Sequence, residues 1–246
     1  MNAKEKKKEQ KPRSEDSDAG TADLIRELGL AAPGTDFERD LQYISIIGSI
    51  EGHIALPMEN KTTKYEHLIP QLIAVEENPK LRGLLVILNT MGGDVEAGLA
   101  LAEMIATLSK PTVSLVLGGG HSIGIPLATA TDYSFIAGTA TMTLHPIRTT
   151  GLVITAETTF DYMRKTQDRV IDFIAGHSRA TRKRVTELMN CSDNMSNDVG
   201  TILFGKEAVD AGIIDAVGGV SQALGELRRR VAKVDELEKE ISISTD

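Results

Sequence analysis

The sequence contains one cysteine, no tryptophan and few aromatic residues, and each scarcity excludes a class of protein. Because Cys191 is the only thiol, the chain can form no internal disulfide and no cysteine cluster for a metal ion, as in proteins of the reducing cytosol. The aromatic fraction of 4% leaves few rings on which the bases of a single-stranded nucleic acid could stack. Acidic residues outnumber basic ones by 35 to 27, and the formal charge of -8 also argues against a nucleic-acid partner.

Long apolar runs are also missing. The longest, such as residues 84–88, are far too short to span a bilayer. No apolar segment follows the lysines near the N-terminus, as it would in a secretory signal. We therefore expect a cytoplasmic protein without membrane insertion. The 246 residues suffice for one domain of roughly 200 residues with a full hydrophobic core, plus tails.

Charge and composition predict three parts in the chain. Residues 1–35 are rich in charged and small polar residues and hold almost nothing apolar before Leu24. This predicts a disordered charged arm, with one or two helical turns over residues 21–30. Residues 36–222 are expected to form the folded domain. Residues 223–246 carry many charges and are predicted to form a helix or a fraying tail.

Strand-like and helix-like patterns alternate through the predicted domain. The apolar runs at residues 84–88 and 112–117 are typical of strands covered on both faces, and each is followed by glycines and then by a helical pattern. Two such β-turn-α units in succession predict neighbouring parallel strands in an α/β fold. Further strands are predicted over residues 43–50, 133–136, 139–144 and 213–214, and helices over residues 65–75, 158–176, 179–189 and around Ala208.

The glycine-rich stretch after the second apolar run contains the first candidate site residue. Three glycines, residues 118–120, precede Ser122 closely, so the backbone must turn sharply between strand and helix. A serine at such a corner projects beside the free N–H groups of the new helix. Residues 120–124 also fit the G-x-S-x-G pattern of nucleophilic serines, although a glycine-rich connector would contain the same residues. The corner makes Ser122 a candidate nucleophile.

A nucleophilic serine requires a general base and donors for the oxyanion. His145 ends an apolar run and is followed by Pro146, so we expect it to face the serine corner as the base. A packed histidine without a catalytic role would show the same local pattern. The backbone N–H groups of Gly93 and Ile123 are the predicted oxyanion donors, because both glycine turns open at the carboxyl edge of the sheet. Glycines at these turns would also allow a helix to pack closely on a strand, and both interpretations can hold together.

The carboxylate of a catalytic triad has two candidates. Asp193 and Asp198 both lie in the polar stretch before the last helix-strand pair of the domain, and either could reach His145. Asp198 is preferred. Cys191 is close in sequence, but no base can be assigned to it, and we interpret it as a bystander. No residue pattern predicts a cofactor or a metal ion.

Four short motifs follow one another in an order known from one family of peptidases. They are Leu-Asn-Thr-Met-Gly-Gly-Asp-Val-Glu-Ala-Gly-Leu-Ala at 88–100, Gly-Gly-His-Ser-Ile-Gly at 119–124, Met-Thr-Leu-His-Pro at 142–146 and Gly-Lys-Glu-Ala-Val-Asp-Ala-Gly-Ile-Ile-Asp at 205–215. In these motifs the chain resembles the caseinolytic ClpP-type peptidases, which have an Asn-Ser-Pro-Gly-Gly-Ser loop, a nucleophile turn, a histidine motif and a closing motif in the same order. The resemblance covers about residues 41–222.

The resemblance implies a fold, an activity and an assembly. The fold would be α/β, a β-α superhelix of the ClpP/crotonase type with parallel strands and a protruding strand-helix handle over residues 149–176. Ser122 would be the nucleophile, His145 the base, and Gly93 and Ile123 the oxyanion donors of a serine endopeptidase that cuts polypeptides. The subunits would form homo-oligomeric stacked rings that enclose the serines.

Three positions depart from the family pattern. Met91 stands where the family has proline, and His121 stands where a small residue usually precedes the serine. The stretch over residues 190–202 is longer than in the family. This leaves Gly200 at the position where the family usually places its aspartate, so Asp198 is chosen by nearness alone.

The charged arm affects whether the protein could work with a ring ATPase. Family members that work with a ring ATPase take substrate through an axial pore lined by their short N-termini. An arm of about 35 residues would hinder that passage. We therefore expect a peptidase that works without such an ATPase or only loosely with one.

Four other functions share part of this pattern. An α/β-hydrolase needs a histidine late in the chain, but His177, the last one, follows no strand-like run. A membrane signal-peptide peptidase of the Ser-Lys kind would need a transmembrane anchor and a suitably placed lysine. A crotonase-like acyl-CoA enzyme would use the same two N–H donors without a serine, and a ring subunit with a degraded triad would be a non-catalytic scaffold. The sequence leaves the last two open.

Overall fold

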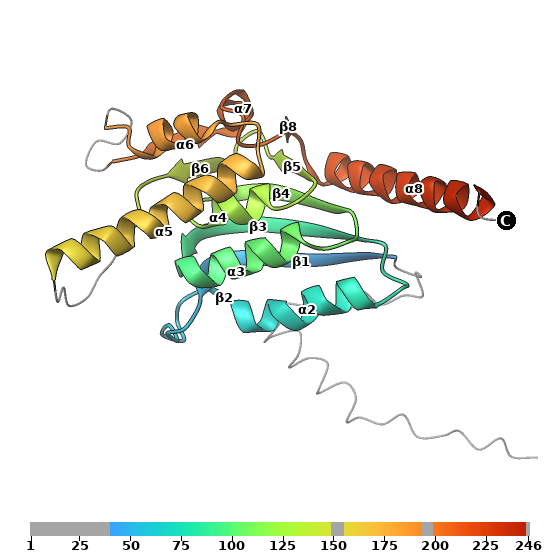
Figure 1. Cartoon of the computed structure of the whole chain (residues 1–246), viewed down its shortest axis with the longest axis horizontal. Helices are drawn as coiled ribbons and strands as arrows, with labels where there is room; N and C mark the ends of the chain where they lie inside the picture. Colours follow the sequence, from blue (N-terminus) through green and yellow to red (C-terminus); the bar gives the residue numbers. More distant parts are fainter. Residues whose placement is uncertain (1–39, 149–154, 193–198, 245–246) are drawn as a thin grey trace, which may run out of the picture. The chain divides into compact units, whose positions relative to one another are not determined.

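The computed structural model describes residues 40–148, 155–192 and 199–244 (Figure 1). The predicted arm over residues 1–35, including the helical turns predicted over residues 21–30, lies outside these residues. The strands are β1 (Leu41–Glu51), β2 (Thr62–Lys64), β3 (Gly83–Gly93), β4 (Thr112–Gly120), β5 (Tyr133–Ile136), β6 (Thr141–Leu144), β7 (Thr201–Phe204) and β8 (Ala216–Val217). The helices are α2 (Tyr65–Glu77), α3 (Val95–Ala106), α4 (Gly124–Thr129), α5 (Ala156–Gly176), α6 (Arg182–Met189), α7 (Gly205–Asp210) and α8 (Val220–Ser244).

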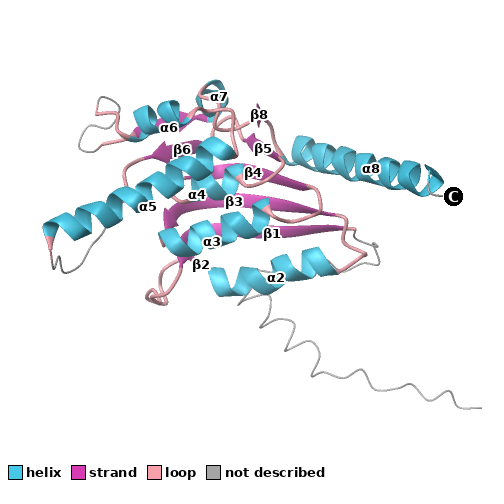
Figure 2. Ribbon diagram, in the orientation of Figure 1, coloured by secondary structure: helices cyan, strands magenta, loops and turns pink. Residues whose placement is uncertain are grey.

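The strands form a sheet in the order β2-β1-β3-β4-β5-β8, in which all neighbours run parallel (Figure 2). β6 joins β4 through a single parallel pair, Gly119 with Thr141, and pairs with β7 in the antiparallel sense. Because β3 and β4 are neighbours, the segments that follow them emerge at the same carboxyl edge. This arrangement confirms the predicted α/β fold and its two successive β-α units.

Helices cover both faces of the central strands, as their continuous apolar sequences predict. Leu84, Val86 and Leu88 of β3 belong to the larger core, which also holds buried residues of α2, α3 and α4. The alternate side chains, Leu85 of β3 and Leu115 of β4, belong to a second cluster with α8. The strands whose ends form the carboxyl edge of the sheet are therefore packed against other elements on both faces.

The first half of α8 packs on the second face of the sheet. Ala223, Leu227 and Val231 are buried there and contact β3, β4 and β5. Beyond Val231 the helix extends past the strands, and Leu237 and Ile241 are exposed (Figure 1). The charged segment predicted as a helix or a tail is thus helical from residue 220 to residue 244. In the described ranges, no helix has both the length and the hydropathy needed to cross a membrane.

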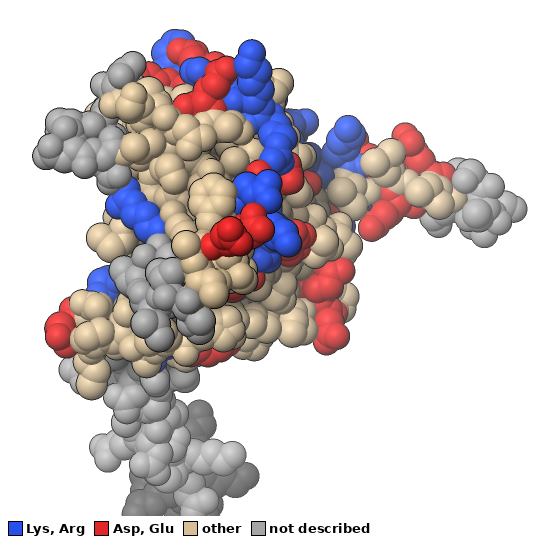
Figure 3. Space-filling view, turned by 60° about the vertical axis from the view of Figure 1, so that its left-hand side comes forward, with Lys and Arg blue, Asp and Glu red and all other residues tan. Residues whose placement is uncertain are grey.

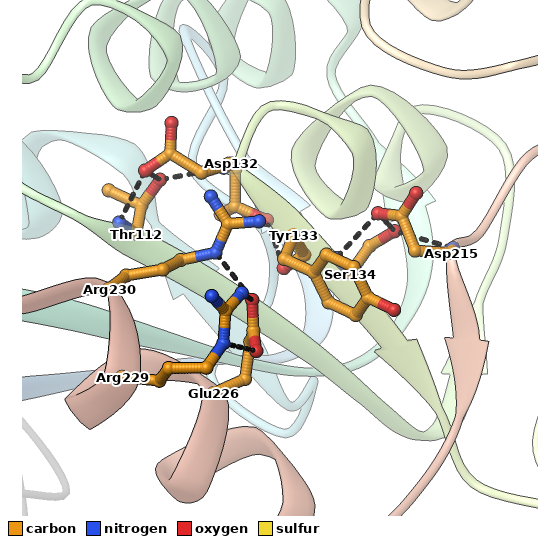
Figure 4. A network of polar contacts seen from close by, with 9 residues as sticks. Thr112, Asp132, Tyr133, Ser134, Asp215, Glu226, Arg229 and Arg230 are labelled. Atoms are coloured by element: carbon orange, nitrogen blue, oxygen red, sulfur yellow. Dashed lines mark hydrogen bonds and ion pairs between the residues drawn. The ribbon is translucent and has the colours of Figure 1, made fainter. Parts of the chain in front are cut away.

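Polar contacts fix α8 and β8 to the start of β5 (Figure 4). Glu226 of α8 accepts a hydrogen bond from Nε of Arg230 at 2.8 Å. The guanidinium carbon of Arg230 lies 5.3 Å from the centre of the Tyr133 ring, within the range of a cation–π contact. Asp215 Oδ2 accepts hydrogen bonds from the N–H and the hydroxyl of Ser134 at 2.9 and 2.8 Å. These contacts tie the end of the chain to the strand beside β4.

Helix α5 forms the described part of the handle predicted over residues 149–176, whose first residues lie outside the described ranges. Its N-terminal half extends past the sheet and exposes Phe160 and Tyr162 (Figure 1). Its C-terminal half is tied to α3 by Arg169, which donates hydrogen bonds to both carboxylate oxygens of Glu96 at 2.7 and 3.0 Å. These bonds lower the pKa of Glu96. Basic and acidic side chains accordingly lie side by side on the face shown in Figure 3.

The structure differs from the predicted elements at four places, and one of them is the short strand β2, which was not predicted and pairs with β1 alone. Ile213 and Ile214, predicted as a strand, are buried at a turn where both N–H groups bond to the carbonyl of Ala208, and strand β8 begins later, at Ala216. Strand β7 was not predicted, because it is short and pairs with β6 alone. Strand β3 continues through Gly93, where a turn was predicted, since a bulge at Met91 of β3, opposite Gly48 and Ser49 of β1, lets the two strands stay paired.

Candidate active site

Ser122 stands at the corner between β4 and α4. Its φ of +55° lies in the left-handed region, and no other non-glycine residue in the described ranges has a positive φ. Ser122 N–H donates to the Thr143 carbonyl of β6 at 2.8 Å, and His121 N–H donates to the Thr90 carbonyl of β3 at 3.1 Å. A side chain in this conformation is strained by about 1–2 kcal/mol. The neighbouring strands impose the strain, as in the sharp turns that present nucleophiles.

Two glycines at the end of β3 make room for this corner. Gly92 has a φ of +94°, and a Cβ there would lie 2.7 Å from the Cβ of Ser122. Gly93 has a φ of +153°, and a Cβ there would lie 2.2 Å from the carbonyl oxygen of Ile50 in β1. Any side chain at either position would push the strand away from its neighbour or from the serine.

A cavity of about 140 Å³ brings four of the predicted site residues together. Ser122, His145, Gly93 and Ile123 all line it. The rest of its wall is mostly aliphatic and consists of Val95, Ile125, Leu144, Ile147, Arg148, Val170, Ile174 and Met189. Among the described residues, no group of three or more His, Cys, Asp or Glu could hold a metal ion. The site therefore combines a hydroxyl, an imidazole and backbone donors with an apolar cavity.

His145 is held by its own neighbour in the sequence. The ring is half-buried, and its Nδ1 lies 2.7 Å from the carbonyl oxygen of Pro146. Because that oxygen can only accept, Nδ1 carries the proton, and Nε2 of the neutral ring keeps the lone pair that a general base needs. In the described part of the chain, no hydrogen bond joins Ser122 Oγ to His145. Such bonds often tighten only when substrate is bound.

Two backbone N–H groups flank Ser122. That of Ile123 has no hydrogen-bond partner within the described ranges, because α4 begins only at the next residue. Asp94 N–H donates to the Ile50 carbonyl of β1 at 3.0 Å. Since successive N–H groups of a strand alternate in direction, that of Gly93 is directed away from β1. Gly93 and Ile123 both line the cavity, and their N–H groups can donate to a substrate oxygen beside the serine.

His121 connects the serine corner to β6, a role that its sequence pattern did not predict. Its Nδ1 lies 2.9 Å from the hydroxyl oxygen of Thr143, and its ring lies so close to Gly119 that a Cβ there would come within 2.6 Å of Nε2. Burial of the ring, and next the charge of His145, lower the pKa of His121. The ring is therefore neutral near pH 7. Thr143 thus holds both His121 and Ser122, one through its hydroxyl and the other through its carbonyl.

The predicted carboxylates lie outside the described residues, so the roles of Asp198 and its alternative Asp193 stay predictions. The strand that follows them is described. It pairs with β6 so that Gly200 faces His145. Gly200 N–H donates to the carbonyl of half-buried Cys191 at 2.7 Å.

Two comparisons with known proteins extend the resemblance seen in the short motifs. The family model for Clp protease matches residues 38–221. The translocation-enhancing protein TepA of Halalkalibacterium halodurans is 52% identical over 222 residues, which make up 90% of this chain and 87% of that protein. Both matches span the described sheet and the serine corner, and they confirm the expected relationship. The chain belongs to the Clp protease family.

Proposed function

We propose that this protein is a serine endopeptidase in which Ser122 is the nucleophile and His145 the general base. The observation that carries the proposal is the convergence of Ser122, His145, Gly93 and Ile123 on one cavity. The strained conformation of Ser122 supports it, since such strain persists mainly where function requires it. Membership in the Clp protease family supports the same class of reaction.

The proposed reaction proceeds through an acyl-enzyme. Ser122 Oγ bonds to the carbonyl carbon of the substrate while its proton passes to Nε2 of His145. The N–H groups of Gly93 and Ile123 donate to the resulting oxyanion, each contributing about 10² to 10³ in rate. The C–N bond breaks as Nε2 gives the proton to the leaving amine. Water, deprotonated by His145, then hydrolyses the ester and restores the serine.

The walls of the cavity indicate the class of substrate. Val170, Ile174 and Met189 supply aliphatic surface next to Ser122, which favours an apolar side chain of moderate size beside the scissile bond. Such side chains are mostly buried in folded proteins. Unfolded polypeptides and short peptides are therefore the proposed substrates.

We further propose that the subunits form stacked homo-oligomeric rings in the cytoplasm, as the family suggests. The exposed Phe160 and Tyr162 of α5 support an assembly contact at the handle. TepA is named as translocation-enhancing, and by its similarity we extend a role linked to protein translocation to this chain. Measurement of the native mass tests the rings, and a monomer at working concentration would contradict them.

We expect no strict need for a ring ATPase. This expectation rests on the charged arm of about 35 residues, which would obstruct an axial pore. Robust ATP-stimulated degradation of a folded substrate by the full chain with such an ATPase would refute it.

Covalent labelling with a fluorophosphonate tests the proposed nucleophile. The wild-type protein should be labelled, Ser122→Ala should not, and His145→Ala should be labelled about 10² to 10⁴ times more slowly. Ser45→Ala is the matched control, because Ser45 is an exposed serine on β1, and it should be labelled like the wild type. A folded wild-type protein that is neither labelled nor able to cleave peptides would contradict the proposal.

A non-catalytic ring subunit is the second candidate, and one observation favours it. Ser122 Oγ and His145 share no hydrogen bond in the described part of the chain, so the pair is not yet arranged for proton transfer. A crotonase-type acyl-CoA enzyme would use the donors of Gly93 and Ile123 alone. Its activity would survive Ser122→Ala, whereas a peptidase would lose all activity.

A further inference from the structure

The hydrogen bond between His145 and Pro146 restricts how the histidine can be oriented. A neutral imidazole has one N–H group, and the distance of 2.7 Å places that group between Nδ1 and the Pro146 carbonyl. The same proton cannot be donated to a carboxylate at the same time. Any carboxylate that acts on His145 would first have to displace this carbonyl.

The peptide group that carries the carbonyl is itself held from its other end. The N–H of Ile147 shares a rigid plane with the Pro146 carbonyl, and it donates to Oε1 of Gln167 at 3.2 Å. Gln167 is half-buried on α5, whose next turn is anchored by buried Val170. The side chain of Gln167 therefore fixes the plane whose carbonyl fixes His145.

The strand that faces His145 offers no side chain in place of that carbonyl. A Cβ on Gly200 would lie 3.0 Å from the Cβ of His145 and 2.3 Å from the Leu144 carbonyl oxygen. The φ of Gly200 is +141°, which is strained for any residue with a side chain. The hydroxyl of Thr201 donates to the Leu188 carbonyl at 2.6 Å and is thus used elsewhere.

We propose that Gln167 is a positioning residue for the peptidase reaction, and that the carbonyl of the peptide it holds replaces the carboxylate of a catalytic triad. The inference rests on the proposed function. The carbonyl keeps the proton on Nδ1 of His145, so Nε2 accepts the proton of Ser122. It brings no full negative charge to the imidazolium. Acylation therefore depends on Gln167 and is insensitive to Asp193 and Asp198.

The test compares two substitutions of Gln167 in the full chain. Gln167→Glu keeps an oxygen that accepts from Ile147 N–H, whereas Gln167→Leu has a similar size and no acceptor. The rate of fluorophosphonate labelling is measured against reagent concentration. Gln167→Leu should lower the maximal rate about ten- to a hundredfold without changing the half-saturating concentration, as misplacement of a catalytic group does. Gln167→Glu should stay within about threefold of the wild type.

A spectroscopic readout separates positioning from general damage to the fold. Nitrogen NMR of histidine-labelled protein should show the proton on Nδ1 of His145 in the wild type and in Gln167→Glu, with the signal assigned by its loss in His145→Ala. In Gln167→Leu the signal should shift toward a mixture of tautomers. Lys165→Leu is the control, since Lys165 is exposed on the same helix, and it should change neither the spectrum nor the labelling rate.

The outcomes distinguish the inference from the proposed function. Equal labelling of wild type and Gln167→Leu, or equal losses in Gln167→Leu and Gln167→Glu, would overturn the role of Gln167. A folded Asp198→Asn or Asp193→Asn variant slowed by about 10² or more would show that a carboxylate orients His145, and would also overturn it. If the wild type is not labelled at all, the proposed function fails and the inference fails with it.

Discussion

Gly92 and Ser122 approach so closely that one methyl group on Gly92 would lie 2.7 Å from the Cβ of the serine. The glycine cannot easily move aside, because its N–H donates to the hydroxyl of Thr90 at 3.0 Å, and that hydroxyl donates to the Gly48 carbonyl at 2.6 Å. The end of β3 therefore sets the position of the serine. Substitutions at this point should act on stability and on labelling together.

Gly92→Ala is expected to abolish labelling of Ser122 and to lower the free energy of unfolding by about 1–3 kcal/mol, since the φ of +94° is strained for alanine. Gly225→Ala is the matched control. A Cβ at Gly225, within α8, would meet nothing within 4 Å, and alanine in a helix should stabilise the protein by about 0.5–1 kcal/mol. Urea unfolding and labelling measure both effects. A Gly92→Ala protein that is labelled normally would contradict this account of the corner.

Replacement of the strained serine should separate stability from activity. Ser122→Gly and Ser122→Ala both lack the nucleophile, and neither should be labelled. The φ of +55° is unstrained for glycine but strained for alanine. The free energy of unfolding of Ser122→Gly should therefore exceed that of Ser122→Ala by about 0.5–1 kcal/mol. The order would reverse if the corner relaxed to an ordinary conformation once the hydroxyl is gone.

Protonation of His121 should weaken the fold at acidic pH. Burial, followed by the charge of His145, lowers the pKa of His121 in the folded state, so the unfolded chain binds this proton more readily. The contribution to stability is complete above the ordinary pKa of about 6.5 and is lost as the pH falls below it. His121→Asn keeps a polar group near Thr143 but cannot be protonated. Its stability should fall less than that of the wild type between about pH 7.5 and 5.5, and equal falls in urea unfolding would argue against this titration.

The cavity should set the preferred substrate side chain. Val170 is 5% exposed and lines the cavity, so Val170→Ala should enlarge it at a cost of about 2 kcal/mol in stability. The ratio of kcat/KM for peptides with phenylalanine rather than valine before the scissile bond should rise about tenfold. Ile73→Ala serves as the control, because Ile73 is exposed on α2 and is not among the residues that line the cavity. An unchanged ratio would show that substrate side chains bind elsewhere.

Local pattern was sufficient to predict the serine corner. The apolar run, the three glycines and the following helix all act within a few residues of Ser122, and the structure shows the same succession in β4, the corner and α4. The end of β3 was less well predicted. Gly92 and Gly93 indicated a turn because glycine is common in turns. In the structure these two residues, with positive φ values, belong to strand β3, which continues after a bulge and stays paired with β1.

The surroundings of His145 could not be read from local pattern. The contact of Gln167 with the peptide before Ile147 joins residues 20 apart and requires α5 to fold back over the end of β6. Likewise, Gly200 meets His145 only because β7 pairs with β6, and the polar sequence before β7 gives no sign of a strand. Long-range pairing of short segments decides these contacts.

The packing of α8 has a consequence for synthesis of the protein on the ribosome. Leu85 and Leu115 are made early, but their cover, Leu227 and Val231, comes from near the end of the chain. A nascent chain therefore carries a sheet with one bare apolar face until α8 leaves the exit tunnel. Chains that stop before residue 231 keep that face uncovered, and they should be captured by chaperones or degraded before they can assemble.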